Sequence, residues 1–417
     1  MTINRFYLFL TFLVIAISGN PAMNVLGKET VYIGTLVIFM VLWWFKPLKL
    51  SRQDELAFGL FALIVLTHVL SFGSLVIAAS LGFLIKLGIA LLAARLIPEF
   101  PRRYVSVMYV LACLSLVFYI PVQLGIDLAG ILSPIRIPLA NIEVIHIGIH
   151  NFHVPDESGR NCGMFWEPGA FAGYLILALF FLVRGGQNKA MLSKQGLVLI
   201  ATLLTTQSTT GYLAFMVLVV FYAFNAGWAR SVAVKWVVFP LFLVLFMSVE
   251  LAIFSQVSFL GEKINAQIES AVARDDTSRI NRVGNILYDL KWIADKPVLG
   301  WSATPEMRLS IDAEVADLIA GQGNGLTGFT VRFGLVGLFI FIGFFANSTR
   351  RITGSMSASL FGIVIVCVLL NGEQFMNFPM FLSLMFVPQI KSKSLPVSPV
   401  AVSRKSSFVG RRSGYRT

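Results

Sequence analysis

The chain has 417 residues, of which 57% are hydrophobic and only 13% are charged. A soluble core cannot bury so much apolar surface, and a membrane β-barrel would need short alternating strands, so the composition predicts an all-α polytopic membrane protein. The formal net charge of +12 does not indicate nucleic-acid binding, because the basic residues lie mainly between apolar runs.

Apolar runs long enough to cross a bilayer predict about 12 transmembrane helices. They lie at residues 5–20, 29–45, 55–71, 74–97, 104–124, 168–184, 193–207, 208–226, 232–250, 325–346, 356–372 and 374–390. The three cysteines (Cys113, Cys162 and Cys367) lie far apart, without metal-type spacing, so a disulfide framework is not expected.

The basic residues predict the orientation of these helices. With both termini in the cytoplasm, 21 of the 33 Lys and Arg residues fall in cytoplasmic segments. The expected organisation is helices 1 to 9 within residues 1–249, with an external loop at 125–167, and helices 10 to 12 within residues 325–390. Residues 250–324 form a polar external segment, and residues 391–417 form a disordered basic tail.

The polar segment at 250–324 holds eleven of the 21 acidic residues. Each charge at the bilayer centre costs about 2.5–3.5 kcal/mol, so we expect a soluble helical cap over the bundle. Residues 276–297 predict a helix that Pro297 ends. Arg279 and Arg282 share its first turn, where the helix dipole favours an anion. An apolar stripe follows at Ile280, Val283, Leu287, Leu290 and Ile293.

Several polar residues stand out near the predicted helices. Pro168 suits a first helical turn, so Glu167 lies at a helix entrance, where it can cap the helix or act chemically. Arg332 and Lys86 fall inside apolar runs, and charged residues there are functional candidates, although Lys86 could also snorkel to the interface. Glu373 and Gln374 add polar groups on the same outer side.

Three histidines, His146, His150 and His153, have a spacing that would suit zinc on a helix. Gly148 and Pro155 weaken a helix there, so we expect no metal site.

Taken in order, these motifs resemble the O-antigen polymerase (Wzy-type) and O-antigen ligase superfamily over most of the chain. The resemblance is carried by Arg160 with Gly163-Met-Phe-Trp-Glu-Pro, by Gln207-Ser-Thr-Thr-Gly, by Ser278-Arg279 with Lys296-Pro-Val-Leu-Gly300, and by Gly323-Asn324-Gly-Leu. It implies a glycosyltransferase of the bacterial inner membrane that needs neither metal nor cofactor. Its partners would be an undecaprenyl-diphosphate-linked oligosaccharide, the lipid bilayer and a chain-length regulator.

By that resemblance, Arg160, Arg279, Arg282 and Arg332 would bind the diphosphate, and Glu167, Gln322 and Asn324 would be catalytic. Ligases and many polymerases of the superfamily carry His directly before the last Asn, where this chain has Gly323. Neither Gly323 nor Gln322 can act as a general base, so Glu167 is the substitute, with Glu314 and Asp317 behind it. The expected function is a polysaccharide polymerase. A ligase and a non-enzymatic lipid-linked sugar transporter are the alternatives.

Overall fold

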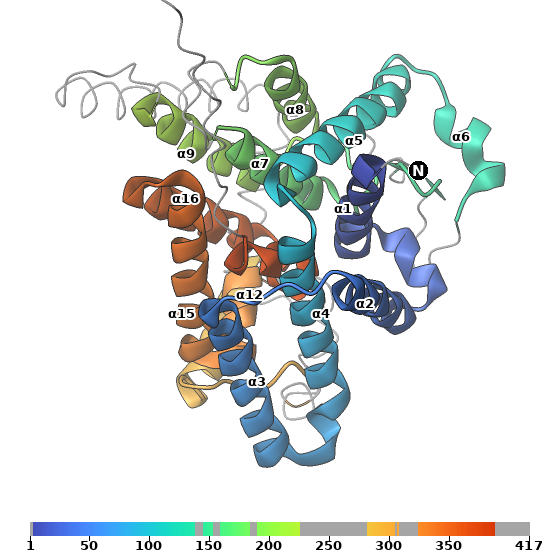
Figure 1. Ribbon diagram of the computed structural model, residues 1–417. Coiled ribbons are helices and arrows are strands. Elements are labelled where there is room, and N and C mark those ends of the chain that lie inside the picture. Colours follow the sequence, from blue (N-terminus) through green and yellow to red (C-terminus); the bar gives the residue numbers. More distant parts are fainter. Residues whose placement is uncertain are drawn as a thin grey trace, which may run out of the picture.

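The computed structural model describes residues 3–137, 145–152, 159–183, 190–225, 282–304, 307 and 324–387. These residues are mostly helical (Figure 1). The longer helices are α1 (Ile3–Gly19), α2 (Lys28–Phe45), α3 (Arg52–Phe72), α4 (Ile77–Leu96), α5 (Phe100–Gln123), α7 (Pro168–Val183), α8 (Lys194–Thr205), α9 (Thr209–Asn225), α12 (Arg282–Asp295), α15 (Gly325–Thr353) and α16 (Met356–Gly372). Short turns and helices connect them: η1 (Pro21–Leu26), η2 (Gly73–Val76), α6 (Leu128–Leu132) and η3 (Ser133–Ile135).

Four stretches among the described residues are long and apolar enough to cross a membrane. They are α2, the run from Arg52 to Leu96 that joins α3, η2 and α4, then α5, and α15. Shorter apolar helices of 10–17 residues accompany them, among them α1, α7, α8 and α16. The fold is therefore that of a helical protein with membrane-spanning candidates. The other predicted spans and the external cap stay predictions, and the segment predicted at 232–250 lies outside the described residues.

The span predicted at 374–390 is wrong over residues 375–387. Three short pieces stand there instead: η5 (Phe375–Asn377), α17 (Pro379–Leu382) and η6 (Ser383–Met385). Phe378 is extended, with φ −120° and ψ 140°, because a residue before proline avoids the helical region. This plug segment (residues 375–387) contacts α1, α4 and α15, and Met380 and Phe381 are fully buried. It fills the centre of the bundle.

Helix α7 is the most buried of the long helices. Nearly all of its side chains are buried, and it packs against α5, α8 and α9. Its sequence is apolar on every face, as expected for a helix enclosed by others. The hydroxyl of Tyr174, near its middle, donates to the carbonyl oxygen of Ser18 at 2.7 Å. This bond fixes α7 against the end of α1.

Helix α15 is broken at Gly334, where φ is 66° and ψ is −177°. The segment 297–302, which includes most of the Lys296-Pro-Val-Leu-Gly300 motif, lies in this break. Trp301 N donates to Val331 O at 2.8 Å, and Leu335 N donates to Pro297 O at 2.8 Å. Gly334 is required, because a Cβ atom there would collide with the carbonyl oxygen of Val298.

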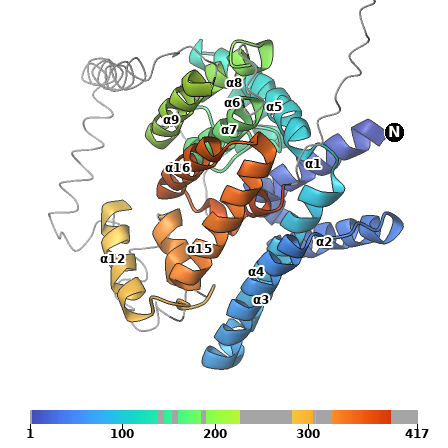
Figure 2. The same ribbon diagram turned by 60° about the vertical axis from the view of Figure 1, so that its left-hand side comes forward.

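The apolar stripe predicted for the 276–297 helix coincides only in part with the face that this helix buries. The start of that helix lies outside the described residues, and α12 ends at Asp295 shortly before Pro297, as predicted. Leu290 is 49% exposed, whereas Trp292 is buried beside Trp301. Helix α12 lies along the first half of α15 in both ribbon views (Figures 1 and 2). Aromatic packing on segment 297–302, which apolar periodicity does not reveal, sets the orientation of this helix.

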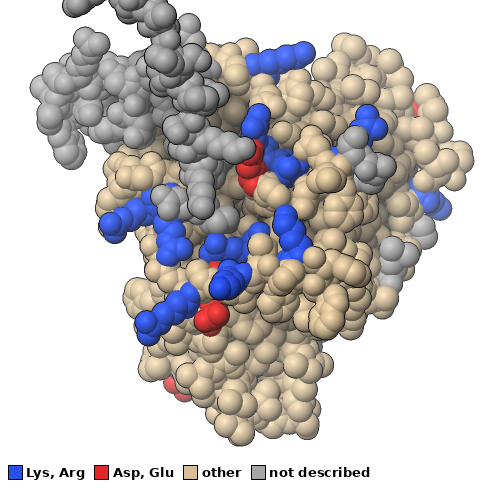
Figure 3. Space-filling model, in the orientation of Figure 1, with Lys and Arg blue, Asp and Glu red and all other residues tan. Residues whose placement is uncertain are grey.

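Charge is unevenly placed on the face shown in Figure 3. Lys and Arg side chains gather in a band across the middle, above a lower part with few charges. The lower part is where the α3–α4 hairpin extends in Figure 1. A surface of this kind suits contact with lipid.

Candidate functional site

Two adjoining cavities lie where η1, α2, α4, α15 and the plug segment meet. The inner cavity has a volume of about 410 Å³ and is lined by Ser18, Trp166, Glu373 and Gln374 among others. The second, the α2–α4 cavity, has a volume of about 640 Å³. Both are lined by the same four residues: Lys28, Tyr32, Asn377 and Phe378. We treat them as one candidate site.

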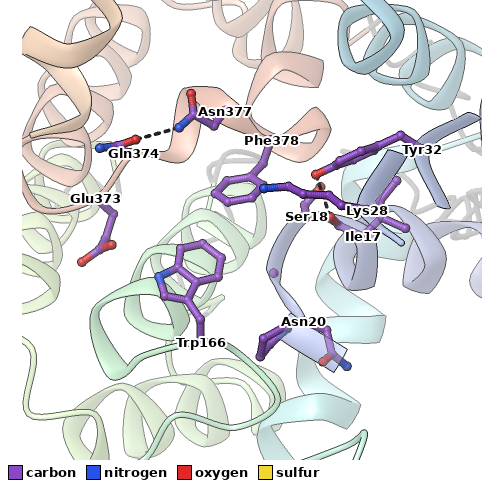
Figure 4. A pocket seen from close by; sticks show the side chains of 12 residues that line it. Ile17, Ser18, Asn20, Lys28, Tyr32, Trp166, Glu373, Gln374, Asn377 and Phe378 are labelled. Carbon is purple, nitrogen blue, oxygen red and sulfur yellow. Dashed lines mark hydrogen bonds between the residues drawn. The ribbon is translucent and has the colours of Figure 1, made fainter. Parts of the chain in front are cut away.

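Three basic side chains line this site. Lys28 reaches into the inner cavity from the start of α2, between Tyr32 and Phe378 (Figure 4). Lys86 and Arg332 line the α2–α4 cavity, and the Lys86 ammonium lies 5.2 Å from the centre of the Tyr32 ring. Among the described residues, neither lysine forms an ion pair. Two carboxylates, Glu29 and Glu373, also line the site, so the cations outnumber them and favour an anionic ligand.

Arg332 is oriented by neutral acceptors. Its Nη1 donates to Asn377 Oδ1, and its Nη2 donates to Gln374 Oε1 at 3.1 Å. Asn377 Nδ2 also donates to Gln374 Oε1, at 2.8 Å. The backbone of Arg332 is held as well, since Ser302 N donates to its carbonyl oxygen at 3.0 Å. The guanidinium is thus held by Gln374 and Asn377, and the backbone of Arg332 is held by segment 297–302.

Two carboxylates meet at the first turn of α7. A Cβ atom placed at Gly169 would lie 2.8 Å from Glu373 Oε1 and 3.3 Å from Glu167 Oε1, so the two groups flank this glycine. Glu373 lines the inner cavity, and its carboxylate points away from Gln374 and Asn377 (Figure 4). The predicted catalytic residue Glu167 therefore lies beside Glu373, which lines the cavity, and does not line the cavity itself.

Asn324 is the N-cap of α15. Its Oδ1 accepts hydrogen bonds from Leu326 N and Thr327 N, and its Nδ2 donates to Asn371 Oδ1 at 2.5 Å. The side chain is 1% exposed. Asn324 therefore joins the start of α15 to the end of α16, directly before Glu373. Its predicted catalytic role stays a prediction. In this position it would act by holding Glu373 in place.

The motif around Arg160 packs on the Gln207 motif. Arg160 Nε donates to Thr206 O at 3.3 Å, and Gln207 Nε2 donates to Gly159 O at 3.0 Å. Asn161 is buried and donates to Thr205 Oγ1 at 2.9 Å. Two motifs of the predicted site are therefore joined. Arg160 itself is not among the residues that line the two cavities.

The other predicted residues are only partly described. Gln322, Arg279, Glu314 and Asp317 lie outside the described residues, and Arg282 is the first residue of α12, with its side chain outside the described part. Their proposed contacts with a diphosphate remain predictions.

The histidine motif forms a hairpin rather than a helix. Strand β1 (Ile145–His146) pairs antiparallel with β2 (Asn151–Phe152), and Gly148 in the turn has φ 83°. His146 Nδ1 accepts from Gly148 N at 2.9 Å, and burial lowers its pKa, which keeps the ring neutral. His150 stacks on Phe118. His153 lies outside the described residues, and no metal-binding group occurs in the part of the chain that the structure covers.

Sequence reasoning missed Lys28, Tyr32, Asn377 and Phe378, which line both cavities. Lys28 is a lysine at the start of a helix, which is common in any sequence. Asn377 and Phe378 fall within the span predicted at 374–390, so they are expected to be ordinary helix residues. Lys86 and Arg332 were found because a charge within an apolar run is costly and therefore conspicuous.

This arrangement can hold an anion and deprotonate a hydroxyl group. Arginine and lysine are the side chains that bind phosphate, and a carboxylate beside them can accept a proton. The aromatic rings of Tyr32, Trp166 and Phe378 add apolar contact surface. A comparison with protein-family models and with curated proteins finds no match to this chain.

Proposed function

We propose that the chain is a polysaccharide polymerase. It would transfer an undecaprenyl-diphosphate-linked glycan onto a lipid-linked repeat unit during O-antigen or exopolysaccharide synthesis. The observation that carries the proposal is the meeting of Lys28, Lys86 and Arg332 with the Glu373–Glu167 pair around one cavity system within an apolar helical bundle.

The transfer makes one bond and breaks one bond. The hydroxyl oxygen of the acceptor attacks the anomeric carbon of the donor glycan, and the bond from that carbon to the diphosphate oxygen breaks. The diphosphate leaves with the electron pair, and the three cations stabilise its growing charge. The hydroxyl proton passes to a carboxylate, for which Glu373 lines the cavity and Glu167 lies beside it.

The remaining parts of the proposal follow from the sequence. Arg160, Arg279 and Arg282 would assist with the diphosphate from the external loops. The chain would lie in a bacterial inner membrane with both termini in the cytoplasm, and a chain-length regulator would be its partner. The carboxylate pair supports the proposed transfer, because the attacking hydroxyl group needs a proton acceptor.

Transfer can be measured in proteoliposomes that contain a polyprenyl-diphosphate-linked repeat unit. We expect Arg332→Lys to lose about 10²–10³-fold in rate, because lysine keeps the charge but loses the paired donors that Asn377 and Gln374 orient. Glu373→Gln should lose about 10²–10⁴-fold, the usual contribution of a general base. Glu55→Gln, an exposed carboxylate on α3, is the control and should keep full activity.

Product analysis in cells separates the alternatives. Cells that lack the protein should accumulate single repeat units on the lipid carrier, with no long polymer. Normal polymer that is no longer joined to lipopolysaccharide would identify a ligase instead. Repeat units trapped on the cytoplasmic side of the membrane, with neither polymer nor single units outside, would identify a transporter.

A further inference from the structure

The α2–α4 cavity has an apolar wall beside its charged end. The wall is formed by Ile33 of α2 and by Ala78, Ala79, Leu81, Gly82 and Ile85 of α4. A Cβ atom placed at Gly82 would meet nothing within 4 Å. The wall therefore has free space beside α4, because the residues of α4 at this point have small side chains.

The residues that line the cavity lie to one side of the point where the two helices touch. A Cβ atom at Gly88 would lie 3.4 Å from Leu36 Cδ1, which marks the contact between α4 and α2. The cavity is lined by earlier residues of both helices, and the two helices diverge toward those ends in Figure 2. Ile33 is 50% exposed and Leu81 is 54% exposed. The cavity mouth thus lies on the apolar outer surface of two membrane-spanning candidates.

Charged side chains line this opening together with the apolar wall. Lys28, Lys86 and Arg332 line the same cavity as the apolar wall, and the carboxylate of Glu29 lines it too, so three cations face one anion. A small soluble anion would match the cations but would leave the wall unused. A ligand with an acidic head and a long apolar tail matches both, because the head meets the cations while the tail replaces lipid along the wall.

We propose that the α2–α4 cavity is the lateral portal and binding site for a polyprenyl diphosphate. The diphosphate lies between Lys28, Lys86 and Arg332, and the first isoprene units lie along Gly82 between Ile33 and Leu81. The rest of the tail stays in the bilayer. This inference rests on the proposed function, since it assigns a path to the lipid part of the donor.

The portal can be blocked without changing the charge. Phenylalanine at Gly82 would occupy the free space of the wall, whereas Gly59→Phe is a matched control. Gly59 is an exposed glycine of α3 that also has nothing within 4 Å and does not line the cavity. We expect Gly82→Phe to weaken binding of polyprenyl diphosphate in proteoliposomes by about tenfold or more, and Gly59→Phe to leave it unchanged.

A photo-cross-linking residue at position 81 provides a measurement that does not depend on that variant. In vesicles of phosphatidylethanolamine and phosphatidylglycerol, it should attach to polyprenyl diphosphate, and unlabelled polyprenyl diphosphate should compete. The same residue at position 63, which is exposed on α3, should attach only to bulk lipid. Attachment to phosphatidylglycerol alone at position 81, or equal labelling at both positions, would overturn the portal.

The two proposals fail in different ways. If position 81 cross-links to polyprenyl diphosphate but the protein transfers no glycan, the portal proposal stands and the polymerase proposal is wrong. Full transfer by Gly82→Phe would keep the polymerase and reject the portal.

Discussion

The break in α15 makes a quantitative prediction for Gly334→Ala. A residue other than glycine at φ 66° and ψ −177° is strained by about 1–3 kcal/mol. The new methyl group would also collide with the Val298 carbonyl oxygen, so segment 297–302 has to move. Four backbone hydrogen bonds join that segment to residues 331–336. Losing one or two of them costs about 0.5–1.5 kcal/mol each. We expect a total loss of about 1.5–6 kcal/mol of local stability.

Hydrogen exchange monitored by mass spectrometry is the direct assay. Peptides that cover residues 297–304 and 331–337 should exchange faster in Gly334→Ala, because the amides of Trp301, Ser302 and Leu335 donate across this pairing. Gly343→Ala is the matched control in the same helix. It has nothing within 4 Å and should be neutral or more stable by up to about 1 kcal/mol. Equal exchange in the two variants would refute the view that Gly334 holds this junction.

Three further outcomes are expected. Thr327→Val removes the hydroxyl that donates to Asp289 Oδ2 at 2.6 Å, so it should destabilise the contact between α12 and α15 by about 1.5–3 kcal/mol, measured as faster exchange in α12. Because burial lowers the pKa of His146 in the folded state, only the unfolded chain gains a proton as the pH falls through about 6.5. The unfolding midpoint should therefore decrease below that pH, and His146→Gln should lose this dependence. A single cysteine at position 265 should react with an impermeant label in spheroplasts and one at position 400 should not. The reverse pattern would contradict the predicted orientation.

The helical class and four members of the site, Lys86, Arg332, Glu373 and Gln374, could be predicted from the sequence. Lys86 and Arg332 were visible because each interrupts an apolar run, and Glu167 was visible because a proline follows it at a helix start. The cavity could not be predicted. It joins Lys28 to Asn377, which are far apart in sequence, and hydropathy carries no information on such contacts.

The plug segment shows why its fold was missed. Residues 375–387 are as apolar as a span, and a buried irregular segment cannot be distinguished from a membrane helix by hydropathy alone. The signal that was available is local: Phe378 precedes a proline, which disfavours a helical conformation at that residue. The break at Gly334 was equally hidden, because this stretch holds several glycines and glycine within an apolar helix is usually tolerated.

The position of the plug segment also has a consequence for biosynthesis. Residues 375–387 leave the ribosome after α1, α4, α7 and α15, yet these residues occupy the centre around which those helices pack. Met380 N donates to Ser18 Oγ at 3.0 Å. The first helix therefore lacks this hydrogen bond until a residue 362 positions later has been translated. During synthesis the earlier helices can insert into the membrane, but their shared interior stays open until this segment arrives. A nascent chain stopped before residue 375 should thus be inserted in the membrane with its helices incompletely packed. It should be a preferred substrate for membrane quality-control proteases.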